Sequence, residues 1–262
     1  MSSVSSFNPL YSLSGLLVGI LVGQTGVGGG SLMTPLLILL FGIHPATAVG
    51  TDLLFAAVTK ICGTLVHGIN RTVSWTLTGR LAMGSIPATA LTLFVISKLA
   101  IRGEYASMLI SSVLGVALVF TAASLMLRKQ ILALAAGQID RLSETQIRNL
   151  TIVTGFVMGV LVSLSSVGAG AVGVTAMIFL YPRMRLARIV GSDIAHAVPL
   201  TLCAGAGHWV LGGVNWTLLG SLLLGSIPGI LIGSYLSARV PEWVLRPVLA
   251  ITLLVVGIRL FL

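Results

Sequence analysis

Two short glycine-rich strings lie at matching places in the two halves of the chain, and their composition suits a binding site for an anion. The first reads Gly26-Val-Gly-Gly-Gly-Ser31 and the second Ser166-Val-Gly-Ala-Gly170. A glycine-rich break inside an apolar helix leaves backbone N–H groups without helical partners. Such groups at the start of a half-helix attract negative charge. A single string would equally suit close helix packing, but its recurrence favours the anion site.

A lysine inside an apolar segment is the natural partner of that anion. Charges at membrane depth are costly and usually face a cavity or a partner. Lys60 has no acid within one turn of its own segment, and Thr201 takes its place in the second half of the chain. With the polar neighbours of the glycine strings, it completes a set of candidate binding residues. These are Gln24, Thr25, Gly26, Gly28, Gly29, Gly30, Ser31, Lys60, Ser163, Ser165, Ser166, Gly168, Ala169 and Gly170.

Five further ionisable residues inside apolar segments are candidates for gating or proton coupling: Asp52, His67, Asp193, His196 and His208. Asp193 and His196 are three residues apart, which places them side by side on a helix. For Asp52 and Asp193, tying neighbouring backbone together is an equal alternative, because each follows a Val-Gly-Thr/Ser step. His67 and His208 lie near the ends of their segments, where anchoring at the membrane interface is the favoured interpretation.

No pattern in the chain indicates a catalytic residue, a cofactor or a metal site. Cys62 and Cys203 are most simply small packing residues, and no spacing of His, Cys and acids is typical of a metal site. The first glycine string lacks the Lys-Ser/Thr of a phosphate loop. The net charge of +9 comes without a basic stripe or an aromatic platform, so we expect no nucleic-acid partner.

The composition requires a lipid environment. Hydrophobic residues make up 56% of the 262 residues and charged residues 8%, against roughly 25% charged in a soluble domain. The mean hydropathy is +1.08. These values exclude a soluble enzyme, a disordered protein and a disulfide-stapled secreted domain. Residues 1–14 contain no Lys or Arg, so we expect the first apolar segment to be retained and not cleaved as a signal peptide.

The chain also contains an internal duplication. Val49–Lys98 aligns with Val190–Arg239 without gaps, and sixteen of these fifty positions are identical. The identities include Asp, Cys, His, Trp and Pro in register, which chance similarity between apolar segments does not produce. We therefore divide the chain into an N-terminal repeat (1–127), a polar linker (128–144) and a C-terminal repeat (145–262).

Each repeat holds five apolar segments, of which the second is too short to span a membrane. Twelve helical residues cover ~18 Å of a ~30 Å hydrocarbon core. The first two segments therefore form either one broken helix or a hairpin that turns back. The predicted segments are 9–23, 31–42, 46–68, 75–98 and 105–127, then 145–164, 171–181, 187–211, 215–238 and 241–262.

The distribution of Lys and Arg favours the hairpin. In the hairpin arrangement, ten Lys and Arg residues of the loops lie on the same side of the membrane as the linker and two lie on the other side. With straight broken helices the numbers are five and seven. Each repeat then crosses the membrane an odd number of times, so the repeats are oppositely oriented. We predict an all-α polytopic membrane protein of two inverted-topology repeats. Each has a broken or re-entrant helical hairpin plus three transmembrane helices, with the linker cytoplasmic and both termini periplasmic.

Several of these strings resemble the sulfite exporter TauE/SafE family. They are the opening Gly15…Gly19…Gly23…Gly26-Val-Gly-Gly-Gly30, HPATAVGTDL from His44 to Leu53, IVGSDIAHAVPLT from Ile189 to Thr201, and GSIP in both halves. The resemblance covers nearly the whole chain. It implies a multi-pass permease of the bacterial inner membrane for anions such as sulfite, sulfoacetate, related organosulfonates or thiosulfate.

Together these observations predict a transporter that binds a small sulfur-containing anion near the bilayer midplane and works by alternating access. Export of an anion is favoured by a negative cytoplasm, at ~2.3 kcal/mol per charge and 100 mV. One alternative is an intramembrane enzyme with Asp193 and His196 as an acid–base pair. The other is a non-transporting membrane scaffold. The sequence leaves the oligomeric state open.

Overall fold

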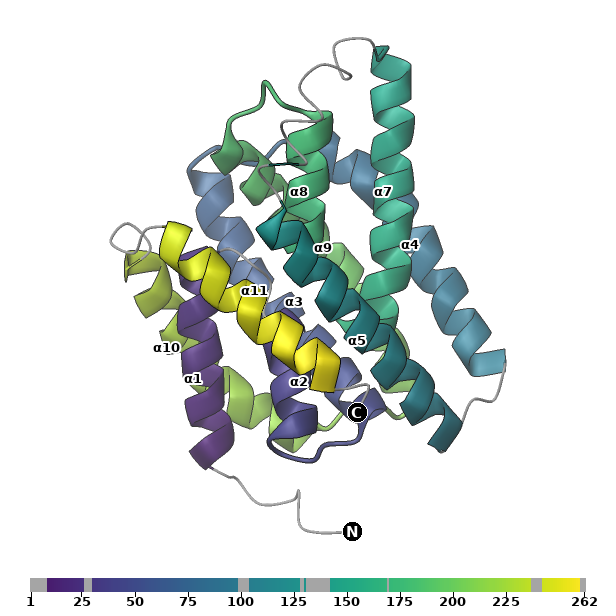
Figure 1. The fold of residues 1–262 in the computed structure, drawn as a ribbon, viewed down its shortest axis with the longest axis vertical. Coiled ribbons are helices and arrows are strands. Elements are labelled where there is room, and N and C mark those ends of the chain that lie inside the picture. Colours follow the sequence, from purple (N-terminus) through teal and green to yellow (C-terminus); the bar gives the residue numbers. More distant parts are fainter. Residues whose placement is uncertain are drawn as a thin grey trace.

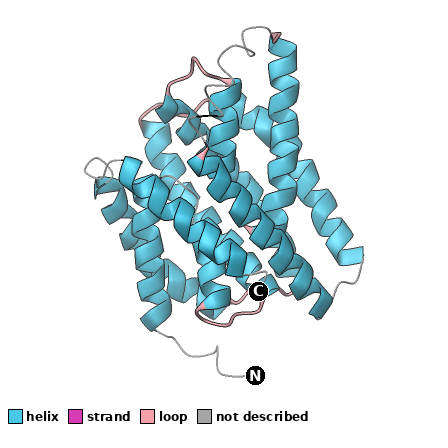
Figure 2. Cartoon of the chain, in the orientation of Figure 1, coloured by secondary structure: helices cyan, strands magenta, loops and turns pink. Residues whose placement is uncertain are grey.

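The computed structural model describes residues 9–25, 30–98, 104–127, 130, 142–168, 170–236 and 242–259. Within these ranges every regular element is an α-helix (Figure 2). The first half provides α1 (Pro9–Thr25), α2 (Gly30–Leu39), α3 (Pro45–Ile69), α4 (Trp75–Lys98) and α5 (Glu104–Met126). The second provides α7 (Glu144–Ser165), α8 (Ala171–Leu180), α9 (Leu186–Val210), α10 (Trp216–Leu236) and α11 (Glu242–Arg259). The bounds agree with the predicted segments to within three residues.

Five of these helices are long and apolar enough to cross a membrane: α3, α4, α7, α9 and α10. Their ends follow local chemistry. Pro45 begins α3, where its missing N–H costs nothing. Ser143 and Gln146 form a capping box at the start of α7. In contrast, α2 and α8 have ten residues each, which cover ~15 Å of a ~30 Å core.

Both short helices run back along the helix that precedes them. Tyr181, directly after α8, has its hydroxyl 2.8 Å from that of Thr151 in the first third of α7. Phe41, just after α2, lies edge-on to Tyr11 near the start of α1, with ring centroids 4.8 Å apart. The ends of each pair therefore meet, which a single broken helix running straight on would not allow.

The most extensive contacts between helices join helices from different halves of the chain. Helix α1 packs along α10, α7 along α4, α3 along α9, and α5 along α11 (Figure 1). Exchanging the halves converts the α1–α10 contact into the α7–α4 contact. The pattern of helix packing therefore follows the internal duplication of the sequence. Each half supplies packing partners for the helices of the other half.

Glycines set the close approach at these contacts. A Cβ on Gly84 of α4 would overlap the carbonyl oxygen of Ile152 in α7. Gly225 of α10 lies in the same way against the carbonyl oxygen of Ser12 in α1. Small residues at such positions let helix backbones touch, and packing of this kind holds helices together in lipid.

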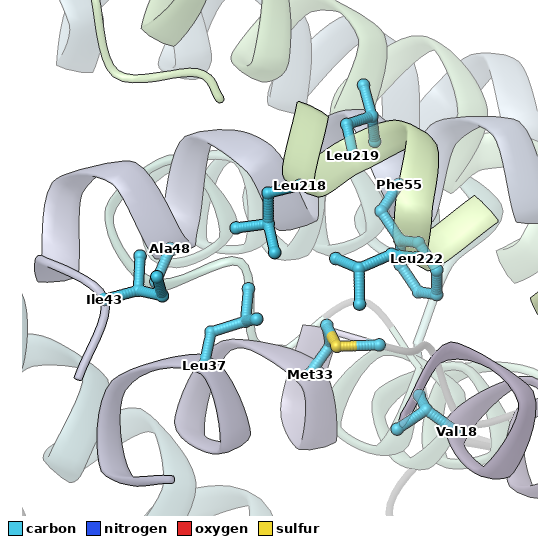
Figure 3. Packing of buried hydrophobic residues seen from close by; sticks show 9 residues of the cluster. All are labelled: Val18, Met33, Leu37, Ile43, Ala48, Phe55, Leu218, Leu219 and Leu222. Carbon is cyan, nitrogen blue, oxygen red and sulfur yellow. The ribbon is translucent and has the colours of Figure 1, made fainter. Parts of the chain in front are cut away.

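One large apolar cluster fills the space between α1, α2, α3 and α10. Phe55 of α3 is fully buried there and meets Leu222 of α10 and Met33 of α2 (Figure 3). Leu37, Leu218 and Val18 extend the cluster on either side. A similar apolar cluster of Leu77, Leu81, Met177, Leu180 and Ile189 fills the equivalent place in the other half, but His196 stands at the position that matches Phe55.

Candidate functional site

Four ionisable residues lie together where α3 packs against α9. They are Asp52 and Lys60 of α3 and Asp193 and His196 of α9, with exposed fractions of 0%, 5%, 1% and 0%. The Lys60 ammonium group interacts electrostatically with both carboxylates and with the imidazole. The sequence shows no acid within a turn of Lys60, and the structure supplies Asp193 from the other half of the chain.

Two hydrogen bonds connect this group to neighbouring helices. The hydroxyl of Thr34 in α2 donates to Asp52 Oδ2. Ser85 Oγ of α4 lies 2.8 Å from His196 Nε2, and the tautomer of the ring decides which atom donates. Both partners are fully buried. These hydrogen bonds therefore connect side chains from four helices, α2, α3, α4 and α9.

Several buried polar atoms in this group have no hydrogen-bond partner within the described part of the chain. They are Asp52 Oδ1, both carboxylate oxygens of Asp193, His196 Nδ1 and Ser166 Oγ. A buried polar group without a partner costs roughly 1–3 kcal/mol, and more if it is charged. So many in one place mark a site that is completed by something else, such as a proton, water or a ligand.

The break between α7 and α8 lies beside these residues. Ser166 ends α7 in a left-handed conformation with φ 58°, and its hydroxyl lies near Asp52. Gly168 has φ 116° and Gly170 has φ 144°, which favour glycine. The first N–H groups of α8 follow directly and have no helical partners. The start of α8 and Asp52 therefore lie on either side of Ser166, and the role of the second glycine string in binding an anion stays a prediction.

The three serines before the break have different roles. Ser163 Oγ donates to the carbonyl of Gly159 at 2.6 Å and lies 3.1 Å from Thr89 Oγ1, so it links α7 to α4. Ser165 Oγ donates to the carbonyl of Leu161 at 2.7 Å and accepts from the N–H of Val167. Ser166 differs from both, because its buried hydroxyl bonds to no carbonyl of its own helix and lies beside Asp52.

Gly173 is a site residue that sequence reasoning missed. A Cβ at this position of α8 would overlap Asp193 Oδ1 and come within 2.6 Å of the Met158 methyl group. Gly173 therefore lets the Asp193 carboxylate and the Met158 methyl group lie against α8, and a larger residue would require these two side chains to shift. The only sequence signal is a glycine that lies a few residues past the string, and nothing in its spacing points to α9. Thr34 and Ser85 were likewise missed.

The two histidines near helix ends form different contacts. His67 is half-buried and its Nδ1 lies 2.8 Å from Thr72 Oγ1, which itself donates to the carbonyl of His67. His208 is buried, and its Nε2 donates to the carbonyl of Ser163 at 2.8 Å. His67 thus stabilises the loop after α3, and His208 ties α9 to α7. Neither reaches the group around Lys60 by a hydrogen bond.

The first glycine string lies largely outside the described residues. Gly26, Gly28 and Gly29 fall there, as does Ala169 of the second string. Gln24 and Thr25 end α1, while Gly30 and Ser31 begin α2. In the parts of the chain that the structure describes, no three His, Cys, Asp or Glu side chains could hold a metal ion. The group around Lys60 offers instead two carboxylates, an ammonium and an imidazole, which can exchange protons and bind an anion.

The helices, their length and the buried polar group define a multi-pass α-helical membrane protein with a potential transport site in its interior. The chain belongs to the Sulfite exporter TauE/SafE family, whose sequence model matches residues 11–260. It is therefore a membrane transporter and not an enzyme, and the resemblance noted in the sequence is confirmed.

Two curated relatives from Bacillus subtilis (strain 168) match almost throughout. The probable membrane transporter protein YjnA is 41% identical over 249 residues, covering 95% of this chain and 97% of the relative. The probable membrane transporter protein YdhB is 26% identical over 249 residues, with 93% and 96% covered. No solved structure matches the chain significantly.

Proposed function

We propose that this protein transports a small sulfur-containing anion, of the sulfite or organosulfonate class, across the bacterial inner membrane. The observation that carries the proposal is that Lys60 and the hydroxyl of Ser166 both lie by Asp52, while Asp193, the other carboxylate near Lys60, lies against Gly173 in the first turn of α8. A lysine ammonium, a hydroxyl and free backbone N–H groups are the donors that a compact oxyanion requires. The name of the family, sulfite exporter TauE/SafE, agrees with this substrate class.

The anion takes the place of a carboxylate at Lys60. In the structure Asp193 and Asp52 share the lysine charge. An entering anion would repel both carboxylates, so binding is strengthened when one of them holds a proton. Asp193 is suited to this role, since neither of its oxygens has a hydrogen-bond partner in the described residues. His196 lies one turn further along α9 and is a second proton acceptor. Asp52 is the other carboxylate near the lysine.

Transport by alternating access follows from two oppositely oriented repeats, 1–127 and 145–262. The exchangeable helix packing and the two helical hairpins support this arrangement. The hairpins would act as re-entrant segments that meet near the midplane, with the linker cytoplasmic and both termini periplasmic. Export is the favoured direction, because the membrane potential drives anions outward.

The test is flux of labelled sulfite and sulfoacetate in proteoliposomes, with phosphate and chloride as comparison anions. We expect flux of the sulfur anions to exceed that of the others, and to increase when a pH gradient supplies protons from the side of the anion. Equal flux of all four anions would refute the substrate class. Sulfite flux that is independent of the proton gradient would refute the role of Asp193.

A further inference from the structure

An open groove of about 510 Å³ lies at one end of the helix bundle, apart from the site around Lys60. Arg183 and Arg188, from the segment between α8 and α9 and the first turn of α9, form its charged wall together with Tyr181. The remaining described lining is apolar and comes from the start of α7, the end of α8 and the same connecting segment. It consists of Leu142, Ile147, Leu180, Pro182 and Met184.

The groove lies at the depth of lipid headgroups. Helices α7 and α9 are both candidate membrane spans, and they begin at Glu144 and Leu186. The groove is built from residues within a few positions of both starts. It therefore opens where two spans leave the hydrocarbon core. The Lys and Arg distribution places this end on the cytoplasmic side, where anionic lipids attract basic residues.

Neighbouring residues hold the polar wall in position. The Tyr181 hydroxyl is 2.8 Å from Thr151 Oγ1 and accepts a hydrogen bond from Arg80 Nη1 at 3.3 Å. Arg80 thus adds a third positive charge near the two arginines of the wall. Among the described residues near the groove, the first turn of α7 contributes one acid, Glu144, so basic side chains outnumber acidic ones in that set.

We infer that this groove binds an anionic phospholipid of the cytoplasmic leaflet. The lipid phosphate would lie against Arg183 and Arg188, whose planar guanidinium groups suit phosphate oxygens. The glycerol and upper acyl chains would cover the five apolar residues. A hydrated free anion would satisfy the arginines but leave that apolar surface uncovered, and the combination of the two surfaces therefore favours a lipid.

The test compares lipids and variants on the purified full chain in neutral detergent. Phosphatidylglycerol should raise the unfolding temperature of the wild type at lower concentrations than phosphatidylcholine does. In Arg183→Gln/Arg188→Gln the apparent affinity for phosphatidylglycerol should fall by on the order of 10-fold or more. Arg185→Gln is the matched control, because Arg185 belongs to the same segment but does not line the groove. It should retain wild-type affinity.

Three results would overturn the inference. The first is an equal response of the wild type to the two lipids, which needs no variant to fold. The second is an equal loss in the control and the double variant, which would indicate attraction to surface charge in general. The third is displacement of phosphatidylglycerol by millimolar inorganic phosphate, which would indicate a free-anion site. Recovery of binding by Arg183→Lys/Arg188→Lys would support the inference, since lysine retains the charge.

Discussion

Ser85 Oγ and His196 Nε2 lie 2.8 Å apart and join α4 to α9 beneath the group around Lys60. The positions 141 residues away in the other half hold different chemistry. Ser226 matches Ser85, but its buried hydroxyl has no partner among the described residues. Phe55 matches His196 and belongs to the apolar cluster. The duplicated scaffold therefore has a polar contact between Ser85 and His196 where the other half has Ser226 and Phe55, and His196 belongs to the candidate site.

This difference gives a prediction with an internal control. Ser85→Ala removes the partner of a buried imidazole nitrogen and should lower the free energy of unfolding by about 1–3 kcal/mol. Ser226→Ala removes a buried hydroxyl that has no partner, so its effect should be close to zero or slightly stabilising. Unfolding in mixed micelles would measure both. Equal losses would show that the Ser85–His196 contact contributes nothing specific.

A second prediction separates the structural role of Lys60 from its role in transport. Lys60→Met leaves Asp52 and Asp193 without their shared cation and should destabilise the protein by about 3 kcal/mol or more. Asp193→Asn in the same chain should recover part of this loss without restoring sulfite flux. Lys98→Met, at an exposed position, is the matched control and should preserve both properties. Full transport by the double variant would exclude Lys60 from the anion site.

A third prediction concerns backbone conformation at the break. Gly168 has φ 116°, which L-residues rarely adopt, although a Cβ would meet no atom closer than 3.8 Å. Gly168→Ala should therefore distort the start of α8 and abolish flux while the protein still inserts. Gly212→Ala is the control, because Gly212 also has positive φ, at 78°, in open space after α9. It should cost about 1–2 kcal/mol and leave flux intact. Loss of flux in both variants would mean that general strain is responsible.

Helix packing between the halves provides a fourth prediction. Gly84→Ala and Gly225→Ala should each push apart two touching backbones and lower stability. Gly79 and Gly220 lie on the same two helices with nothing within 4 Å of an added Cβ. Their replacement by alanine should be neutral or stabilising by about 0.5–1 kcal/mol. Thermal unfolding of all four variants would reveal whether the two close contacts differ from the two open positions.

The topology gives a fifth prediction, for cysteine labelling in a chain that carries Cys62→Ser and Cys203→Ser. Ser143→Cys and Met184→Cys should react from the cytoplasmic side, because both lie at the end of the bundle where α7 and α9 begin. Asn215→Cys follows the end of α9, a candidate span, and should react from the opposite side. Labelling of Ser143→Cys and Met184→Cys from opposite sides would eliminate the hairpins and the inverted repeats.

The limits of sequence reasoning are clear from particular residues. The duplication predicts that Asp52 and Asp193 are equivalent, and periodicity predicts their helices. The partners of these residues come from distant elements, however. Gly173 faces Asp193 because α8 returns along α7 in one specific register, and Ser85 reaches His196 across 111 residues. Such contacts depend on rotation and depth of packed helices, which hydropathy and composition do not encode. Lys60 has no acid within one turn in its own segment, and Asp193 of α9 supplies negative charge in addition to Asp52.

The contact of α1 with α10 also determines when the protein can be completed during synthesis. Ser12 of α1 donates its hydroxyl hydrogen bond to the carbonyl of Ser221, which the ribosome adds 209 residues later. Until then α1 remains in the lipid, where its apolar surface is tolerated but its glycine face has no neighbour. Helix α1 can thus dock only after α10 has been made, and a chain released before α10 emerges leaves α1 without its main packing partner.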